Sequence, residues 1–162
     1  MEGPLTKEML PLALPSGLTV RQTRTEDGFR DDPVAVRQLE VIRGLLRKAD
    51  GAITATDTSR EGQLVARNLY GYLGFKGKTE RLWLSSLTDD AIREAFFDLR
   101  PDSLYEDLYL AGRARREADR IIGYNASLAL GMAAKRKNHS LGRVQTPVLA
   151  LISRRYLKNR DF

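Results

Sequence analysis

The stretch ATDTSREGQ, residues 55–63, carries two carboxylates, a small hydroxyl and an arginine within a few positions. Asp57 ends a short apolar run, and Glu61 follows one helical turn later. A carboxylate at the carboxyl end of a buried strand lies at the sheet edge where α/β proteins bind ligands. Asp57 and Glu61 are therefore candidate ligands for Mg²⁺, which takes a few carboxylates and keeps several waters. Arg60, between them, is a candidate partner for a phosphate.

The same residues also fit an ordinary helix start. Thr58 as the N-cap and Glu61 at the third helical position would form a capping box, which stabilises a helix and carries no chemistry. Ser59 has a small hydroxyl, which in a turn is more often a cap or a backbone partner than a metal ligand. Spacing alone favours the capping box over the metal site.

Lysine and arginine are distributed unevenly along the 162 residues, whose formal net charge is +6. Residues 113–162 hold 12 of these cations against three acids, whereas residues 1–112 carry a small excess of acids. A basic half beside a mildly acidic half suggests a polyanion-binding surface next to a cation site. A solvated basic helix face would give the same charge pattern.

Composition excludes several classes of site. The chain has no cysteine, which rules out disulfides, thiolate zinc sites and cysteine nucleophiles, and its one histidine, His139, leaves little room for a histidine-based cluster. The apolar runs are far shorter than the ~20 residues of a membrane span. We expect a cytoplasmic protein that does not enter a membrane.

Hydrophobic spacing predicts an α/β first half. Helices are expected at 33–48, 61–73 and 89–99, with Asp32 as the N-cap and Pro33 at the first position of the first of them. Strands are expected at 51–57 and 80–87, with a further short strand at 18–22 in a segment 1–32 that is otherwise poorly defined. This alternation favours a parallel sheet.

Beyond residue 100 the pattern predicts helices alone, at 104–124, at 126–135 and from Thr146-Pro147 onward. We therefore expect an α/β part at residues 1–102 and an all-helical part at residues 103–162. A parallel sheet of two or three strands is small. The chain thus looks like a piece of something larger.

Charged residues interrupt the apolar stripe of the helix expected at 104–124. Arg115 lies on that stripe, where a guanidinium without an anion would be costly, and Arg116 and Arg120 flank Asp119. A surface ion pair contributes only ~0.2–0.5 kcal/mol, so orienting arginines toward phosphates or base edges is a better reason for the cluster. Tyr124 would offer a face for an unpaired base, although a core tyrosine is the commoner interpretation.

A second polar cluster precedes the last expected helix. Ser140, Arg143 and Gln145 lie just before Thr146-Pro147, where a helix N-terminus favours a phosphate. Arg143 would add charge, and Gln145 an amide able to contact a base. Ordinary loop residues and a cap are the alternative, and His139 is interpreted as a polar loop residue.

Four segments, in this order and at these distances, resemble type IA DNA topoisomerases, most closely the topoisomerase III branch: ATDTSREGQ, RLWLSSLTDDAIREAF, GRARREADRIIGYNAS and HSLGRVQTPVLALI. The resemblance covers residues 34–162. It implies a partial Toprim-type parallel sheet followed by the start of a helical domain that binds single-stranded DNA. It also implies that Asp57 and Glu61 are metal-site acids, that Arg60 neighbours the reaction centre, and that the single-strand groove is lined by Arg115, Arg116, Asp119, Arg120, Tyr124, Ser140, Arg143 and Gln145.

The sequence departs from the family pattern in three places. The family motif Asp-x-Asp-x-Glu has Ser59 at its middle acid, which removes one charge from the metal site. The first Toprim strand, with its Glu and Lys, has no counterpart in residues 1–32. The segment with the nucleophilic tyrosine is expected beyond Phe162, and none of the six tyrosines here lies in that context.

Two hypotheses follow. In the first, the chain is an internal fragment, natural or cloned, of an enzyme that cleaves, passes and reseals single DNA strands through a 5′-phosphotyrosine. It would be inactive alone, would bind Mg²⁺ weakly, and would have the remaining domains of the same polypeptide as partners. In the second, the chain is a non-catalytic single-stranded DNA-binding or interaction module. Another Toprim enzyme, a primase or nuclease, is disfavoured by the two C-terminal motifs.

Overall fold

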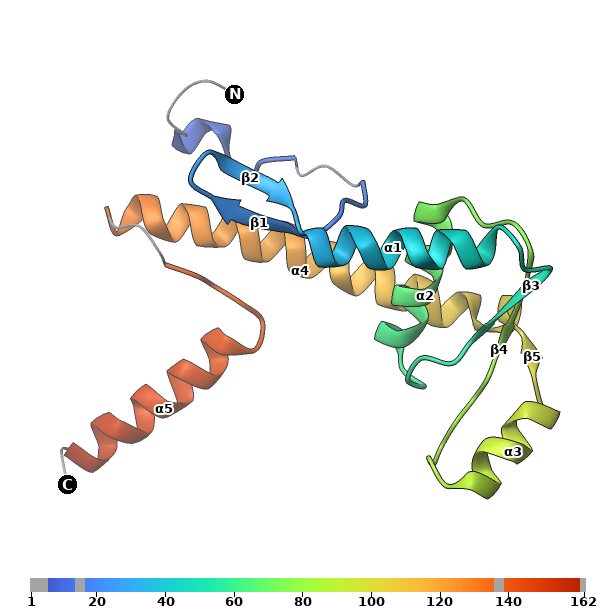
Figure 1. Ribbon diagram of the computed structural model, residues 1–162. Helices are drawn as coiled ribbons and strands as arrows, with labels where there is room; N and C mark the ends of the chain where they lie inside the picture. The colour runs from blue at the N-terminus through green and yellow to red at the C-terminus, as the bar shows by residue number, and fades with distance from the viewer. Residues whose placement is uncertain (1–5, 14–16, 136–138, 161–162) are drawn as a thin grey trace. The chain divides into compact units, whose positions relative to one another are not determined.

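The computed structural model describes residues 6–13, 17–135 and 139–160. The chain is mixed α/β, as expected, and it divides into two compact units (Figure 1). One unit is Ser16–Arg113, and the other is Met1–Pro15 together with Ala114–Phe162. The units reflect contacts within the chain and do not test the expected boundary between residues 102 and 103, which stays a prediction.

A three-stranded sheet lies in the unit Ser16–Arg113, with the order β3-β4-β5. Strands β3 (Gly51–Thr54) and β4 (Lys78–Arg81) are parallel, and the two-residue β5 (Arg100–Pro101) pairs antiparallel with β4. The parallel pair is confirmed. The expected strands at 51–57 and 80–87 are wrong in their bounds, because the pairing covers only four residues of each strand. Strand β5 was not expected.

Helix α1 (Pro33–Leu46) begins as the sequence predicts. The Asp32 carboxylate accepts hydrogen bonds from the backbone N–H groups of Val34, at 2.9 Å, and Ala35, at 3.4 Å, and proline occupies the first turn. The guanidinium of Arg21 donates to the other carboxylate oxygen of Asp32, from Nε at 2.8 Å. This N-cap is therefore both a helix start and an anchor for the segment before it.

Helix α2 (Arg60–Leu73) connects the two parallel strands and ends at Gly74. Gly74 has φ = 68°, a left-handed conformation that glycine adopts at helix C-termini without steric cost. Helix α3 (Asp89–Phe97) follows Thr88, whose side chain makes no capping hydrogen bond, and it ends two residues earlier than expected.

An antiparallel hairpin, β1 (Gln22–Thr25) and β2 (Gly28–Asp31), precedes α1. The expected strand at 18–22 is therefore wrong: the strand begins where that prediction ends. Gly28, after a two-residue turn, has φ = 126°, which side-chain-bearing residues rarely adopt.

The buried centre of this unit is largely polar. Among the described residues only three apolar side chains there are fully buried, Leu64, Ala66 and Leu82. The buried polar side chains outnumber them: Asp32, Thr54, Gln63, Arg81 and Asp102. Buried polar groups are stable only when they are hydrogen-bonded, so these residues need partners. Asp32 is bound by Arg21 and the first turn of α1, and the Thr54 hydroxyl by that of Tyr70. Gln63 and Asp102 bind each other, and Arg81 binds the acidic turn.

Helix α4 (Glu106–Ala133) is continuous and follows the short 3₁₀ helix η2 (Asp102–Tyr105). The expected helices at 104–124 and 126–135 are therefore one helix. Asn125 does not break it, because its side-chain amide donates to the carbonyl of Ile121 at 2.9 Å. The amide of Asn125 also pairs with both backbone groups of Leu12, at 2.6 and 3.2 Å, after the 3₁₀ helix η1 (Lys7–Met9).

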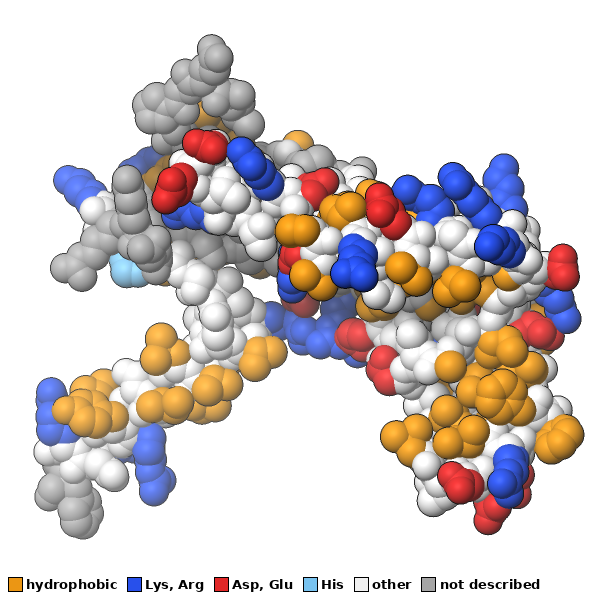
Figure 2. Space-filling model, in the orientation of Figure 1, with side chains coloured by type: hydrophobic (Ala, Val, Ile, Leu, Met, Phe, Trp, Pro, Cys, Tyr) orange, Lys and Arg blue, Asp and Glu red, His pale blue; other side chains and the backbone are white. Residues whose placement is uncertain are grey.

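Helix α5 (Gln145–Arg160) is exposed along its length except at the half-buried Thr146. It begins one residue before the expected Thr146-Pro147. Figure 2 shows its apolar side chains on the surface, and those most exposed include Val148, Leu149, Leu151, Ile152 and Tyr156. Over the described residues no helix is both long and apolar enough to cross a membrane.

Candidate functional site

The acidic turn, residues 55–61, links β3 to α2 as expected. Ser59 is the N-cap: its hydroxyl oxygen accepts a hydrogen bond from the backbone N–H of Gly62 at 3.1 Å. The expected capping box of Thr58 and Glu61 is therefore wrong by one residue, because the helix starts at Arg60 rather than at Ser59. A cap is one of the two ordinary roles that the small hydroxyl of Ser59 suggested.

Ser59 also connects the helix start to the candidate metal ligand. Its hydroxyl donates to the carboxylate of Asp57, while the hydroxyl oxygen accepts from Gly62. The residue that stands in place of the expected acid thus ties Asp57 to the first turn of α2. A second hydroxyl, that of Thr56, donates to the carbonyl of Gly62 at 2.9 Å. Two side chains of the turn therefore bind one residue of the helix.

Arg81, the last residue of β4, binds the turn through three hydrogen bonds. Its Nη1 donates to the Thr56 hydroxyl at 2.6 Å, and its Nη2 donates to the carbonyls of Thr56 and Asp57, at 3.1 and 2.5 Å. The side chain is completely buried, and its guanidinium carbon lies 5.6 Å from the ring centroid of Trp83. Burial lowers the pKa of Arg81, which the negative charge of Asp102 opposes.

A buried polar layer surrounds this arginine. Gln63 donates to one oxygen of Asp102 at 2.6 Å, and Nε of Arg67 lies 2.6 Å from the other. Arg67 also pairs with Glu106 at the start of α4 and lies 5.5 Å from the ring centroid of Tyr109. These charges are compensated within the unit, as buried charges must be.

Two glycines allow the backbone to come this close. A Cβ on Gly62 would overlap both the carbonyl and the carboxylate of Asp57. A Cβ on Gly112, in α4, would lie 2.8 Å from the carbonyl oxygen of Arg60 and 3.4 Å from Cβ of Leu64. The first turn of α2 therefore packs directly against Asp57 on one side and against α4 on the other.

The turn offers two carboxylates to a cation. Asp57 and Glu61 are both exposed, Arg60 between them is exposed, and the Asp57 carboxylate lies against the turn that carries Glu61. Among the described residues no cluster of three or more Asp, Glu or His side chains is placed to hold a metal ion. The donors present are hard oxygens of the kind that Mg²⁺ takes, with water completing its shell.

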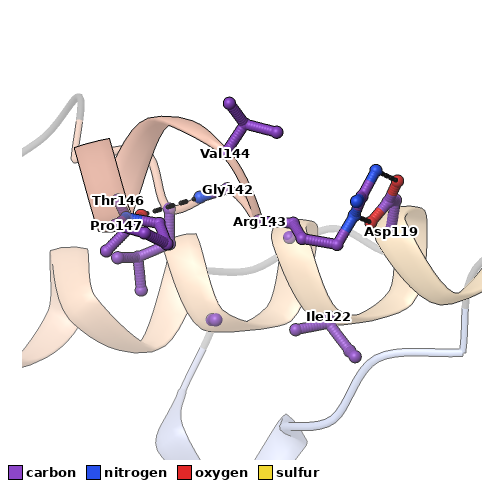
Figure 3. Close-up of a pocket in the computed structure, with 10 residues that line it drawn as sticks. Asp119, Ile122, Gly142, Arg143, Val144, Thr146 and Pro147 are labelled. Carbon is purple, nitrogen blue, oxygen red and sulfur yellow. Dashed lines mark hydrogen bonds and ion pairs between the residues drawn. The ribbon is translucent and has the colours of Figure 1, made fainter. Parts of the chain in front are cut away.

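The two basic segments meet in the other unit. Nε and Nη2 of Arg143 donate to the two carboxylate oxygens of Asp119, at 2.8 and 3.2 Å (Figure 3). This fork lowers the pKa of Asp119, chiefly through its hydrogen bonds, and the positive charge of Arg115 contributes further. The resemblance implies that both residues line the same groove, but the sequence did not predict an ion pair between them.

Two further arginines of α4 share one acid. Arg116 and Arg120 both pair with Glu117, at 3.3 and 2.8 Å. These contacts lower the pKa of Glu117, and the hydrogen bond from Arg116 is the largest cause. Arg115, Arg116 and Arg120 are half-buried, whereas Tyr124 is 47% exposed. The commoner interpretation of Tyr124 as a core residue is therefore wrong.

The segment before α5 is shaped by its own hydrogen bonds. Gln145 donates to the Ser140 hydroxyl at 2.9 Å, so these two predicted site residues are brought together. Gly142 donates to the Thr146 hydroxyl at 3.0 Å. With α4 this segment forms a pocket of about 600 Å³. Figure 3 shows residues that line it, among them Asp119, Ile122, Gly142, Arg143, Val144, Thr146 and Pro147.

Several side chains that shape the candidate site were not predicted from the sequence. Gln63 and Arg81 lie in two of the four segments that carry the resemblance and Asp102 lies in none of them, but spacing and composition assign no role to any of the three. Ser127 accepts a hydrogen bond from the backbone N–H of Leu141 at 2.8 Å and so fixes the segment that carries Arg143. Only the tertiary contacts reveal these roles.

Comparison with known proteins matches residues 103–162 to the family model described as DNA topoisomerase. Over 128 residues the chain is 41% identical to DNA topoisomerase 3 of Staphylococcus aureus strain USA300, and to the same degree to that of strain NCTC 8325. The matches cover 78% of this chain and 18% of each relative, so the chain spans less than a fifth of the length of the curated proteins it matches.

Proposed function

The chain is a type IA, topoisomerase III-like segment of the DNA topoisomerase family, and from this premise we propose that it binds single-stranded DNA and Mg²⁺ as part of a strand-passing enzyme. The observation that carries the DNA part is the Arg143–Asp119 fork. It joins the segment before α5 to α4 within the region that matches the family model. The paired side chains thus make one basic surface from two separate motifs.

The proposed DNA surface consists of groups suited to single strands. An arginine that shares an acid with its neighbours still carries several N–H groups, which can donate to phosphates, and an exposed tyrosine ring such as Tyr124 can stack on an unpaired base. The residues proposed to contact the strand are Arg115, Arg116, Asp119, Arg120, Tyr124, Ser140, Arg143 and Gln145. Asp119 serves here by holding the guanidinium of Arg143 in a fixed orientation.

The proposed metal site is the acidic turn. Asp57 and Glu61 would hold Mg²⁺, which when bound stabilises the negative charge that develops during phosphoryl transfer. Arg60, exposed beside them, would contact a phosphate of the strand. Ser59 contributes no charge, so we expect weak binding by this chain. None of its six tyrosines is proposed as the nucleophile.

The proposed reaction has two phosphoryl transfers. The oxygen of a tyrosine outside this chain attacks a phosphodiester, a 5′-phosphotyrosine forms, and the 3′-hydroxyl leaves with a proton. After a second strand has passed, the same hydroxyl attacks the phosphotyrosine and restores the bond. The contribution of this chain is to bind the strand and the ion, and the chain alone should not relax a supercoiled plasmid.

Binding to a fluorescently labelled oligothymidylate, followed by anisotropy at several salt concentrations, tests the DNA proposal. Arg143→Ala should weaken binding and reduce the slope of log K against log salt by about 0.7, the value for one lost phosphate contact on a single strand. Arg93→Ala is the matched control, because Arg93 is an exposed arginine of α3 in the other unit. Absence of binding at low salt, or equal effects of the two variants, would refute the proposal.

A further inference from the structure

Three hydrogen bonds from one buried guanidinium end on the acidic turn, and this geometry is more than packing requires. Arg81 donates to two successive carbonyls, those of Thr56 and Asp57. It also donates to the side-chain hydroxyl of Thr56. The carbonyl of Asp57 belongs to the same residue as the candidate ligand. A movement of this guanidinium would therefore move the backbone that carries the carboxylate.

The other hydrogen bonds of Thr56 and Ser59 remain within the turn and helix α2. Both hydroxyls bind Gly62, which lies on α2 itself. Gly112 approaches α2 at Arg60 and Leu64. Arg81 thus connects the backbone of residues 56 and 57 to strand β4 through its side chain.

The buried layer in turn fixes Arg81. The side chain is fully buried, stands over Trp83, and lies in the field of Asp102, which is itself held by Gln63 and Arg67. Trp83 stacks on Tyr105, with ring centroids 5.0 Å apart. A guanidinium packed in this way presents Nη1 and Nη2 to the turn in one fixed orientation, while its buried Nε makes no hydrogen bond to the described residues. A preorganised second layer of this kind orients metal ligands.

We propose that Arg81 is a positioning residue, which sets the backbone of the acidic turn so that the Asp57 carboxylate faces a divalent cation. The proposal rests on the metal part of the proposed function. Arg81 touches neither the cation nor DNA, and acts through the carbonyls of Thr56 and Asp57. Its planar fork is required, because the single ammonium of a lysine cannot direct donors to three acceptors in this arrangement.

The test compares Arg81→Lys with Arg67→Lys in the full chain. Both variants keep the charge and both alter the same buried layer, but the ion pairs of Arg67 are with Asp102 and Glu106, which are not residues of the turn. Mn²⁺ serves as the probe, because it takes oxygen ligands like Mg²⁺ and broadens nearby amide resonances. The second measurement is hydrogen exchange of the Gly62 amide, which reports the turn without any metal.

We expect Arg81→Lys to weaken Mn²⁺ binding at residues 57–62 at least fivefold, and to speed exchange at Gly62 at least tenfold. Amides in the second half of α2 should be unchanged. Arg67→Lys acts on Arg81 only through Asp102, so it should change both quantities much less than Arg81→Lys does. Thr56→Val removes the hydroxyl that accepts from Arg81 and donates to the carbonyl of Gly62; it should change both quantities in the same direction to a smaller extent, and it serves if Arg81→Lys does not fold.

Two results would overturn the proposal: a folded Arg81→Lys with wild-type exchange at Gly62, or equal effects of Arg81→Lys and Arg67→Lys. Failure of the metal proposal looks different. If the wild type shows no broadening at residues 57–62, the acidic turn is not a metal site. Faster exchange in Arg81→Lys alone would then still show that Arg81 sets the turn, while refuting its role toward a cation.

Discussion

Substitution of Gly112 by alanine tests the contact between α4 and the start of α2. The added Cβ would lie 2.8 Å from the carbonyl oxygen of Arg60 and 3.4 Å from both its carbon and Cβ of Leu64. Separations below 3.0 Å between such atoms require a shift, and here the nearest atom is backbone. Either α4 or the first turn of α2 must move.

Two opposing terms set the expected change in the free energy of unfolding. Alanine favours a helix interior over glycine by about 0.5–1 kcal/mol. An extra methyl group forced into a packed interior costs typically about 1–3 kcal/mol. Gly112→Ala should therefore destabilise by roughly 0–2.5 kcal/mol, with the steric term larger because a carbonyl in the first turn of a helix has little freedom to yield.

The control is Gly71→Ala, in α2 of the same unit. A Cβ there meets nothing within 4 Å, so only the helix propensity remains and the variant should be more stable than the wild type, by about 0.5–1 kcal/mol. Urea unfolding followed by the fluorescence of Trp83, the single tryptophan, reports this unit. If Gly112→Ala raises the midpoint as much as Gly71→Ala does, the close packing of α4 on α2 is refuted.

Three further changes have defined outcomes. Ser59→Asp places a second carboxylate beside Asp57, and one added charge about 4 Å from a divalent ion in water contributes roughly 2 kcal/mol; calorimetry should show Mg²⁺ affinity raised about thirtyfold over Ser59→Asn. The pKa of Asp32 is lowered by its hydrogen bond from Arg21, so its contribution to stability is present at neutral pH and is lost as pH falls through the folded-state value; thermal unfolding of Asp32→Asn should depend less on pH below about pH 4. Gly74→Ala should lower stability by about 1 kcal/mol in urea, because alanine is strained at φ = 68°; an unchanged midpoint would contradict this.

The parts of the fold that the sequence predicts are those decided by local chemistry. Asp32 before Pro33 specifies a helix start, and Gly74 specifies a helix end, because N-capping and a left-handed conformation depend on one or two residues. The acidic turn was placed correctly for the same reason. The identity of its cap was wrong by one residue, because Thr58 and Ser59 are chemically equivalent as caps and only the path of the chain out of β3 decides between them.

The rest depends on contacts between distant residues. Arg81 follows an acid in a short strand and has the sequence signature of a solvent-facing residue, yet it is completely buried because the turn supplies three acceptors. The pairing of Arg143 with Asp119 joins residues 24 positions apart. The resemblance to a family placed both in one groove, but which side chain binds which is decided by tertiary structure.

The contact of Gly112 with the start of α2 has an evolutionary consequence. Gly112 and Glu106 lie within the stretch that matches the topoisomerase family model, whereas residues 60–67, which they contact, lie before it. An exchange of gene segments at residues 102 and 103 would separate partners that fit each other in shape and charge. We therefore expect the two stretches to be inherited together, with substitutions at Gly112 accompanied by changes at residues 60–64 in related proteins.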